Sequence, residues 1–294
     1  MIDIKECFIC EATEHEEVFK GPYFRGDHQL FSVKRCKNCG FWFTSPRPQA
    51  GPELTKYYET EDYVSHTEQS KTLTDKLYML VRKWALTNKL AIINREQKNK
   101  GALLDYGAGT GAFLEVAQKD GWITTGVEPS NLARQQAERK NVSLFSPDNP
   151  KSFAKNNHYS AITLWHVLEH LPDLNQSLQN FHNWLKPGGT LVIAVPNHES
   201  FDAKKYKENW AALDLPLHLY HFSKSDIRAL AQKHYFEVRR IKNMPFDAFY
   251  VSMLSQGILK KPSLLRAFWI GLKSNWQGLQ NQNMSSLIYV LKKP

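Results

Sequence analysis

The stretch Leu103-Leu104-Asp105-Tyr106-Gly107-Ala108-Gly109-Thr110-Gly111 decides the fold class. Two aliphatic residues and a carboxylate lead into three alternating glycines, and apolar residues at helical spacing follow from Ala112 to Ala117. This pattern predicts a buried strand, a tight turn and an amphipathic helix. Glycine permits backbone angles that a side chain would forbid, and it lets a ligand approach the main chain closely. The turn also aims the first amides of the helix at whatever binds there.

The glycine pattern alone fits two kinds of nucleotide site. Gly107-x-Gly109-x-Gly111 is typical of Rossmann-like methyltransferases, whereas Gly107-x-Gly109-x-x-Ala112 satisfies the dinucleotide fingerprint. Both kinds of site need an acid after the second strand, and Glu128 in Gly126-Val127-Glu128-Pro129 supplies it. A carboxylate there can accept hydrogen bonds from both ribose hydroxyls of an adenosine. These residues alone leave the choice open.

Strand and helix patterns alternate from Gly101 onward. Strands are predicted at about 102–105, 123–128, 142–145, 161–165, 191–195, 237–242 and 287–291, and helices near 112–119, 131–140, 174–185 and 225–233. Asp173 and Ser223 are suited to cap the last two helices. The alternation predicts an α/β protein whose parallel sheet has helices on both faces. Ligands bind beyond the carboxyl ends of such strands, where Asp105, Glu128 and Trp165-His166 fall.

Composition sets broad limits on the protein. The chain has 294 residues, 42% of them hydrophobic, and a formal net charge of +9. That excess favours acidic partners such as nucleic acid, anionic lipid or phosphorylated substrates, although diffuse lysine is also common in ordinary enzymes. The start Met1-Ile2-Asp3-Ile4-Lys5-Glu6 does not resemble a signal peptide, and no apolar run reaches transmembrane length. We expect a cytoplasmic protein.

All four cysteines lie in the first 39 residues, as Cys7-x-x-Cys10 and Cys36-x-x-Cys39. Two such knuckles supply four thiolates, which suits tetrahedral zinc better than two disulfides in a cytosolic chain. No ligand position would remain open, so a structural zinc is expected. We predict a zinc-ribbon-like head over residues 1–45, whose folding depends on the metal. A role of this head in gripping substrate is the alternative.

Prolines 46, 48 and 52 indicate a linker after the head. Tyrosines follow between Tyr57 and Tyr63, and a helical pattern runs from about Thr72 to Gln97. Residues 46–100 are therefore interpreted as a linker and a helical lid over the ligand. Simple packing of these aromatic residues is the alternative interpretation.

Two later motifs favour one of the two nucleotide sites. After the fourth strand comes Trp165-His166-Val167-Leu168-Glu169-His170-Leu171-Pro172-Asp173. Leu185-Lys186-Pro187-Gly188-Gly189-Thr190-Leu191 then stops a helix and turns sharply into the fifth strand. With these motifs, residues 101 to about 242 resemble the class I S-adenosylmethionine-dependent methyltransferases, closest to the branch with "HVLEH" and "LKPGG".

That resemblance implies a Rossmann-like, doubly wound sheet of seven strands, the last of them antiparallel, in a domain spanning residues 101–294. It also implies S-adenosyl-L-methionine as the cofactor. The residues expected to bind it are Asp105, Gly107, Ala108, Gly109, Gly111, Glu128, Pro129, Trp165 and His166.

A cysteine-rich head before such a domain is similar to the sugar C-methyltransferases of deoxysugar pathways. That resemblance implies catalytic roles for two histidines. His221, in Leu219-Tyr220-His221-Phe222, matches the proposed base of that group, and His170 matches a second active-site histidine. Tyr220 stands where that group has an acid, and the extra C-terminal domain of the group is not found in this sequence.

The section at about 244–284 interrupts the pattern before the last strand. It is rich in aromatic and aliphatic residues, with Lys260, Lys261, Arg266 and Lys273 interleaved. Three interpretations remain: a helical cover over a pocket for a bulky or lipid-linked acceptor, an interfacial helix on anionic lipid, or a helical hairpin packed on the core.

The leading functional prediction is methyl transfer to a small-molecule acceptor, such as a sugar, a lipid or a secondary metabolite. An RNA methyltransferase is the first alternative, because the chain is basic, although no RNA-binding module is recognisable. An NAD-dependent enzyme, or a scaffold with a degenerate site, is the second. The partners expected are therefore a sugar- or lipid-linked small molecule first, nucleic acid second, and peripheral contact with a membrane.

Overall fold

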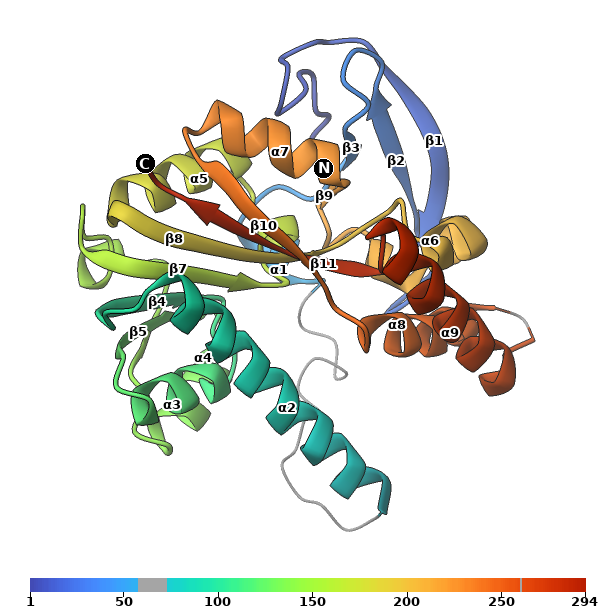
Figure 1. Ribbon diagram of the computed structural model, residues 1–294. Helices are drawn as coiled ribbons and strands as arrows, with labels where there is room; N and C mark the ends of the chain where they lie inside the picture. Colours follow the sequence, from blue (N-terminus) through green and yellow to red (C-terminus); the bar gives the residue numbers. More distant parts are fainter. Residues whose placement is uncertain (58–72, 260) are drawn as a thin grey trace.

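The computed structural model describes residues 1–57, 73–259 and 261–294. The strands of its main sheet are β4 (Ala102–Tyr106), β5 (Ile123–Val127), β6 (Leu144–Phe145), β7 (Tyr159–Trp165), β8 (Leu185–Pro196), β10 (Glu237–Asn243) and β11 (Ser286–Lys292). They lie in the order β10-β11-β8-β7-β4-β5-β6 (Figure 1). Strands β4 to β8 pair in parallel, whereas β11 is antiparallel to both β8 and β10. The predicted seven-stranded sheet with an antiparallel last strand is confirmed.

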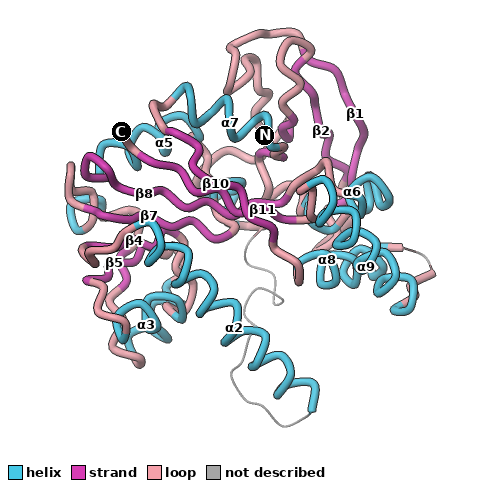
Figure 2. Tube along the Cα trace, in the orientation of Figure 1, coloured by secondary structure: helices cyan, strands magenta, loops and turns pink. Residues whose placement is uncertain are grey.

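Helices cover both faces of this sheet. One face carries α2 (Leu73–Glu96), α3 (Ala112–Lys119) and α4 (Asn131–Glu138), and the other carries α5 (Leu174–Trp184) and α7 (Lys224–Lys233) (Figures 1 and 2). The side chains of Asp173 and Ser223 cap α5 and α7, as predicted. Neighbouring strand residues point to opposite faces, so Leu103 packs toward α2 and α3 while Leu104 belongs to the core beneath α5 and α7.

The Lys186–Gly189 segment forms a bulge instead of a turn outside the sheet. Helix α5 ends at Trp184, and β8 begins directly at Leu185. Tyr159 pairs with Leu185 but Ala161 pairs with Thr190, so the four residues 186–189 of β8 lie opposite the single residue 160 of β7. Gly188 has a φ of 70°, which favours glycine. The sharp change of direction expected from the sequence therefore occurs within the strand.

A smaller sheet of four strands holds the N-terminal segment. It contains β1 (His15–Pro22), β2 (Leu30–Cys36), β3 (Trp42–Thr44) and, from much later in the chain, β9 (Tyr220–His221), in that order. Phe43 pairs with Tyr220 and Trp42 with His221. Phe41 and Phe43 are fully buried in the same apolar cluster as the core beneath α5 and α7. The head thus shares its core with the rest of the molecule.

The helical section after β10 consists of α8 (Asp247–Ile258) and α9 (Leu264–Asn281), beside α6 (Phe201–Tyr206). Short elements complete the described chain: α1 (Pro52–Thr55), and the 3-10 turns η2 (Pro150–Ser152), η3 (Leu168–His170), η4 (Lys207–Asn209) and η5 (Ala211–Leu213). The buried carboxylate of Asp202 accepts hydrogen bonds from Trp210 Nε1 (2.8 Å), Ser274 Oγ (2.6 Å) and Ser285 Oγ (2.7 Å). One charged group therefore joins α6, α9 and the start of β11.

Within the described parts of the chain, none of the helices combines the length and the apolar character that a membrane crossing requires. Of the linker and lid predicted over residues 46–100, residues 58–72, with the tyrosines from Tyr58 onward, lie outside the described residues. The helix predicted from about Thr72 is present as α2, and its role as a lid stays a prediction.

Candidate active site

The glycine loop between β4 and α3 borders open space at Gly109. Gly107, Gly109 and Gly111 have φ angles of 80°, 54° and 73°, where side chains are disfavoured. A methyl group added at Gly107 would lie 2.3 Å from Val167, but one added at Gly109 would meet nothing within 4 Å. The amides of Gly107 and Ala108 are bound to the Val127 carbonyl, at 2.7 and 2.9 Å. The loop is therefore fixed at its start and open to a ligand at Gly109.

Glu128 lies at this opening, where the sequence predicted it. Its buried carboxylate accepts hydrogen bonds from the amides of Gly109 (2.8 Å) and Ser130 (2.9 Å). Burial raises its pKa, while these two amides and Arg134 act in the opposite direction. The carbonyl of Pro129 accepts a hydrogen bond from Arg134 Nη1 at 2.7 Å. A carboxylate beside an open glycine is a suitable acceptor for sugar hydroxyls.

Close to the glycine loop, Lys89 of α2 lies near Asp105 and Trp165. Asp105 is buried and accepts a hydrogen bond from Thr163 Oγ1 at 2.6 Å, and burial raises its pKa to about 6. Lys89 Nζ lies 4.5 Å from the centre of the Trp165 ring. Burial lowers the pKa of Lys89, and the charges of Asp105 and Asp247 oppose that shift. Trp165 Nε1 is buried without a hydrogen-bond partner among the described residues.

Sequence reasoning missed Lys89, because a lysine within a predicted lid helix resembles the other surface lysines. Only the fold shows that its ammonium group meets the ends of the central strands. A half-buried cation there is suited to a carboxylate ligand.

His166 belongs to an ion-pair network rather than standing alone. Its Nδ1 lies 3.5 Å from Glu169 Oε1, and its Nε2 lies 3.2 Å from Asp247 Oδ2. Burial lowers its pKa, but the two carboxylates outweigh this and raise it to about 10. His166 is therefore a cation at neutral pH, and it also has an unusual positive φ of 59°.

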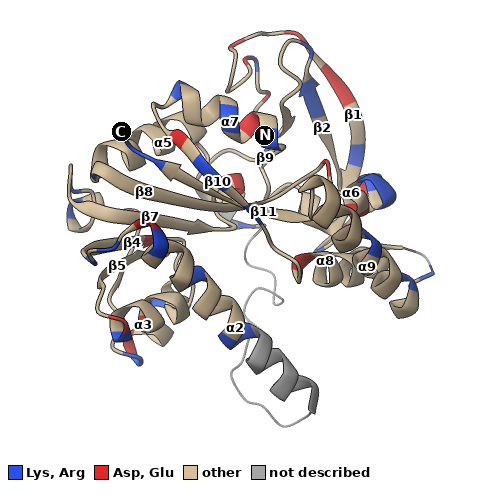
Figure 3. Ribbon diagram, in the orientation of Figure 1, with Lys and Arg blue, Asp and Glu red and all other residues tan. Residues whose placement is uncertain are grey.

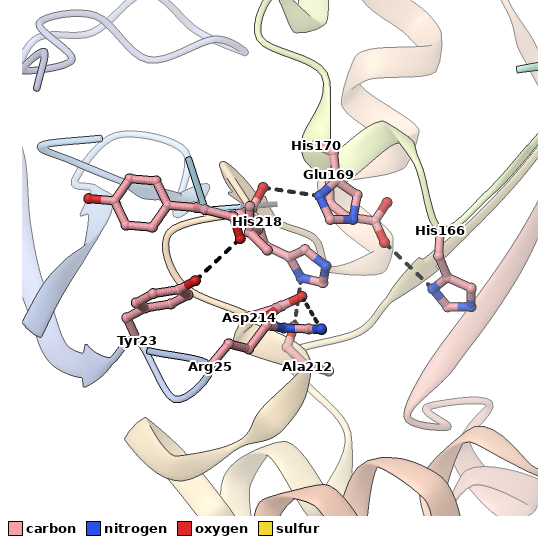
Figure 4. Close-up of polar contacts among 10 residues, drawn as sticks. Tyr23, Arg25, His166, Glu169, His170, Ala212, Asp214 and His218 are labelled. Carbon is pink, nitrogen blue, oxygen red and sulfur yellow. Dashed lines mark hydrogen bonds and ion pairs between the residues drawn. The ribbon is translucent and has the colours of Figure 1, made fainter. Parts of the chain in front are cut away.

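His170 and His218 face each other next to this network (Figure 4). Their ring centres lie 4.6 Å apart. His170 Nδ1 lies 3.1 Å from the Leu217 carbonyl, and His218 Nδ1 lies 2.8 Å from the Ala212 carbonyl. A carbonyl only accepts hydrogen bonds, so both Nδ1 atoms carry a proton, and the neutral form of either ring has its lone pair on Nε2. Burial, followed by the charge of His170, lowers the pKa of His218 to about 3.

Glu169 adds a negative charge to the two imidazoles. It is fully buried, and neither carboxylate oxygen has a hydrogen bond among the described residues. Burial raises its pKa, but His166 and His218 lower it below the usual value. One donor atom each from Glu169, His170 and His218 lies within 4.8 Å of the others. This group can stabilise a proton, or a cation, at the imidazole Nε2 atoms.

His221 lies in β9, and its ring is buried. Its Nε2 is 3.1 Å from Thr44 Oγ1, which itself donates to the His218 carbonyl at 2.7 Å. Because that hydroxyl proton is already used, Nε2 of His221 is the donor to Thr44. Burial, and then the charges of His218 and His198, lower the pKa of His221 well below its usual value.

The four cysteines come together as predicted. The Sγ atoms of Cys7 and Cys39 lie 3.5 Å apart, as do those of Cys10 and Cys36. All four lie within 4.8 Å of one another. An ideal Zn–S tetrahedron with bonds of about 2.3 Å has edges of ~3.8 Å. The cluster therefore fits a zinc ion.

A cavity of about 410 Å³ lies between the head and α6. It is lined by Phe19, Trp42, His198 and Trp210 among others, and Trp42 stacks on His198 with ring centres 4.3 Å apart. None of the residues predicted to bind cofactor or to act in catalysis lines it.

Comparison with known proteins identifies the family. Residues 81–241, more than half of the chain, match the family described as methyltransferase domain. Ubiquinone biosynthesis O-methyltransferases of Coxiella burnetii and Actinobacillus pleuropneumoniae are both 30% identical to this chain, over 125 and 127 residues. These matches cover 40% and 38% of this chain, and the chain spans only about half of each relative, 53% and 54%.

Solved structures agree with the fold. A geranyl diphosphate C-methyltransferase from Streptomyces coelicolor A3(2) has a TM-score of 0.54 at 14% identity, over 78% of this chain and 86% of that one. A Haemonchus contortus phosphoethanolamine N-methyltransferase has a TM-score of 0.51 at 21% identity, over 71% of this chain and 53% of that one. With the strand order and the glycine loop described above, the family match shows that this chain belongs to the methyltransferase domain family.

Proposed function

We propose that this protein transfers a methyl group from S-adenosylmethionine to a small-molecule acceptor, with His170 as the base. The observation that carries the proposal is the fully buried carboxylate of Glu169, which forms an ion pair with His166 but no hydrogen bond among the described residues, beside His170 and His218. This group adjoins the glycine loop, because Val167 packs against Gly107.

The cofactor-binding residues we propose are those around the opening at Gly109. Glu128 would accept the ribose hydroxyls, and the loop from Gly107 to Gly111 would lie against the adenosyl group. Lys89 would bind the carboxylate of the amino-acid portion, supported by its position near Asp105 and Trp165. Bound S-adenosylmethionine would supply a methyl group on a positively charged sulfur. An acceptor atom can attack this methyl group directly and displace the sulfur. Trp165 and His166 complete our proposed set.

The histidines would remove the proton from the acceptor. The Leu217 carbonyl fixes the ring of His170, so Nε2 carries the lone pair. When His170 takes up a proton, the nearby charge of Glu169 would stabilise the imidazolium. The neutral imidazole of His218 packs against the ring of His170. Such a base typically contributes ~10²–10⁴-fold to the rate.

His221 is our second candidate for a catalytic residue. Its protonated Nε2 is directed at Thr44, and its lowered pKa makes it a weak base. A role in orienting the loop from Asp214 to His221 agrees better with these contacts than direct proton abstraction does.

The acceptor class rests on the relatives. They are named for ubiquinone biosynthesis and for geranyl diphosphate, both small molecules with apolar chains. We propose an acceptor of that kind, sugar- or lipid-linked, rather than RNA. A structural zinc at the four cysteines and a cytoplasmic location complete the proposal, and both are supported by the closely grouped free thiols.

The test combines binding with turnover. Calorimetry should detect S-adenosylmethionine and S-adenosylhomocysteine but not NAD. With labelled S-adenosylmethionine and metabolite extracts, a labelled product should appear and can then serve as a defined assay. His170→Asn and Glu169→Gln should lose at least ~10²-fold in kcat while S-adenosylhomocysteine affinity stays within about threefold.

The matched control is His182→Asn on α5, whose ring packs against Tyr235 and Phe236, and which should keep full turnover. Unchanged kcat in His170→Asn would refute the assignment of the base. A bound divalent cation that Cys39→Ser retains and Glu169→Gln loses would instead assign Glu169, His170 and His218 to a metal.

A further inference from the structure

Helix α9 buries its small residues and exposes its large apolar ones, which is the reverse of a typical amphipathic helix. Its buried face consists largely of small residues: Ala267, Gly271, Ser274 and Gly278, with Ile270. Gly271 and Gly278 permit close packing, since an added methyl group would lie 2.8 Å from Phe249 and 2.4 Å from Met284. The large apolar side chains point outward.

The outward face, here called the α9 face, follows helical spacing. It comprises Leu265 (68% exposed), Phe268 (51%), Trp269 (58%), Leu272 (41%), Trp276 (66%) and Leu279 (68%). Isolated exposed apolar residues are common, but six large ones on a single helix face are not. Burying this face would contribute several kcal/mol at about 25 cal/mol per Å², so the face indicates a binding surface.

A second aromatic group lies on the neighbouring helices. Trp84 of α2 and Phe246, at the start of α8, are 48% and 46% exposed, with ring centres 5.1 Å apart. Tyr250 and Met253 of α8 are also about half exposed. Tryptophan and tyrosine are the residues enriched where an apolar phase meets water.

Helix α9 carries basic residues and no acidic ones. From residue 248 to residue 285 the sequence has no Asp or Glu, whereas it has Lys260, Lys261, Arg266 and Lys273. The carboxylate of Asp202, which Ser274 of α9 contacts, is buried on the opposite side of the helix. Figure 3 shows α9 with basic residues and without acidic ones. Arg266 and Lys273 flank the apolar face on one side of the helix. This arrangement is typical of helices that lie in the interface of an anionic bilayer.

A second copy of the chain is a poorer occupant. If α9 packed against α9 of another molecule, Arg266 and Lys273 of both copies would meet with no acid on either helix to pair with them. We propose that the α9 face binds the surface of membranes containing anionic lipid, with the helix lying in the headgroup region. This goes beyond methyl transfer and does not depend on it.

The experiment is vesicle co-sedimentation of the full chain without cofactor or acceptor. The probes are phosphatidylcholine vesicles with and without phosphatidylglycerol. We expect binding to the anionic vesicles that weakens with salt. Trp269→Ser/Trp276→Ser should weaken it at least ~10-fold, whereas Ile123→Ser, which removes another strongly exposed residue, should leave it unchanged. Arg266→Gln/Lys273→Gln should weaken anionic binding by roughly fivefold per charge.

Circular dichroism and S-adenosylhomocysteine binding would verify that each variant remains folded. Absence of wild-type binding to anionic vesicles would overturn the proposal. So would concentration-dependent dimerisation that Trp269→Ser/Trp276→Ser abolishes, because the α9 face would then be an interface between copies.

Discussion

At the scale of single residues, the site depends on which nitrogen of each histidine carries the proton. Backbone carbonyls fix a proton on Nδ1 of His170 and His218, while the Thr44 hydroxyl fixes a proton on Nε2 of His221. Three histidines within 52 residues of sequence thus have different chemical capacities. Sequence patterns identify the residue type but not the tautomer, because the deciding partners are carbonyls that any residue supplies.

The buried, neutral state of His221 makes stability depend on pH. Its pKa in the folded protein is well below 6.5, so below about pH 6.5 the unfolded chain binds a proton that the folded chain does not. Stability from this residue is therefore present above pH 6.5 and is lost as the pH falls. In His221→Asn, the free energy of unfolding between about pH 4 and 6 should depend less steeply on pH, by up to ~1.4 kcal/mol per pH unit.

Chemical denaturation at several pH values measures this slope. His218, with its pKa lowered to about 3, should show the same behaviour, so the two variants can be compared. A His221→Asn protein with the wild-type slope would contradict a neutral, buried His221.

At the scale of elements, the methyltransferase-like strands and caps could be predicted, and the packing of later segments could not. The alternation from Gly101 onward indicated each strand of the main sheet, because buried strands and capped helices have local signals. The β3–β9 pairing joins residues almost 180 positions apart, and no local signal marks it. Likewise, Glu169 reads as an ordinary acid in a short motif, although its burial makes it central to the site.

The carboxylate of Asp202 joins several elements through three hydrogen bonds. Asp202→Ala would leave the donors of Trp210, Ser274 and Ser285 buried without their acceptor. We expect a loss of about 3–5 kcal/mol in the free energy of unfolding. Asp148→Ala, at an exposed position, is the control and should cost less than ~0.5 kcal/mol. Urea denaturation measures both, and similar values for the two would contradict the role of Asp202.

At the scale of the whole molecule, the head and the main sheet form one connected core. Zinc removal should therefore act beyond the first 45 residues. In the presence of a strong chelator, or in Cys39→Ser, we expect hydrogen exchange to speed up at the amides of β3 and also of β9, because β3 is the neighbour of β9 in the small sheet.

Amide exchange followed by mass spectrometry can resolve these strands, with β4 and β7 as internal controls that should stay protected. Faster exchange in residues 1–45 alone, with β9 unaffected, would mean that the head unfolds independently of the site.

The pairing of β3 with β9 also limits how this protein can be re-engineered. Removing residues 1–45 would expose the backbone of the two-residue strand β9, which now pairs with β3, and the rings of Tyr220 and Phe222, which Phe41 now contacts. An uncovered strand edge beside aromatic rings invites self-association. An N-terminal domain from another protein that replaces residues 1–45 would therefore have to supply a new partner strand for β9.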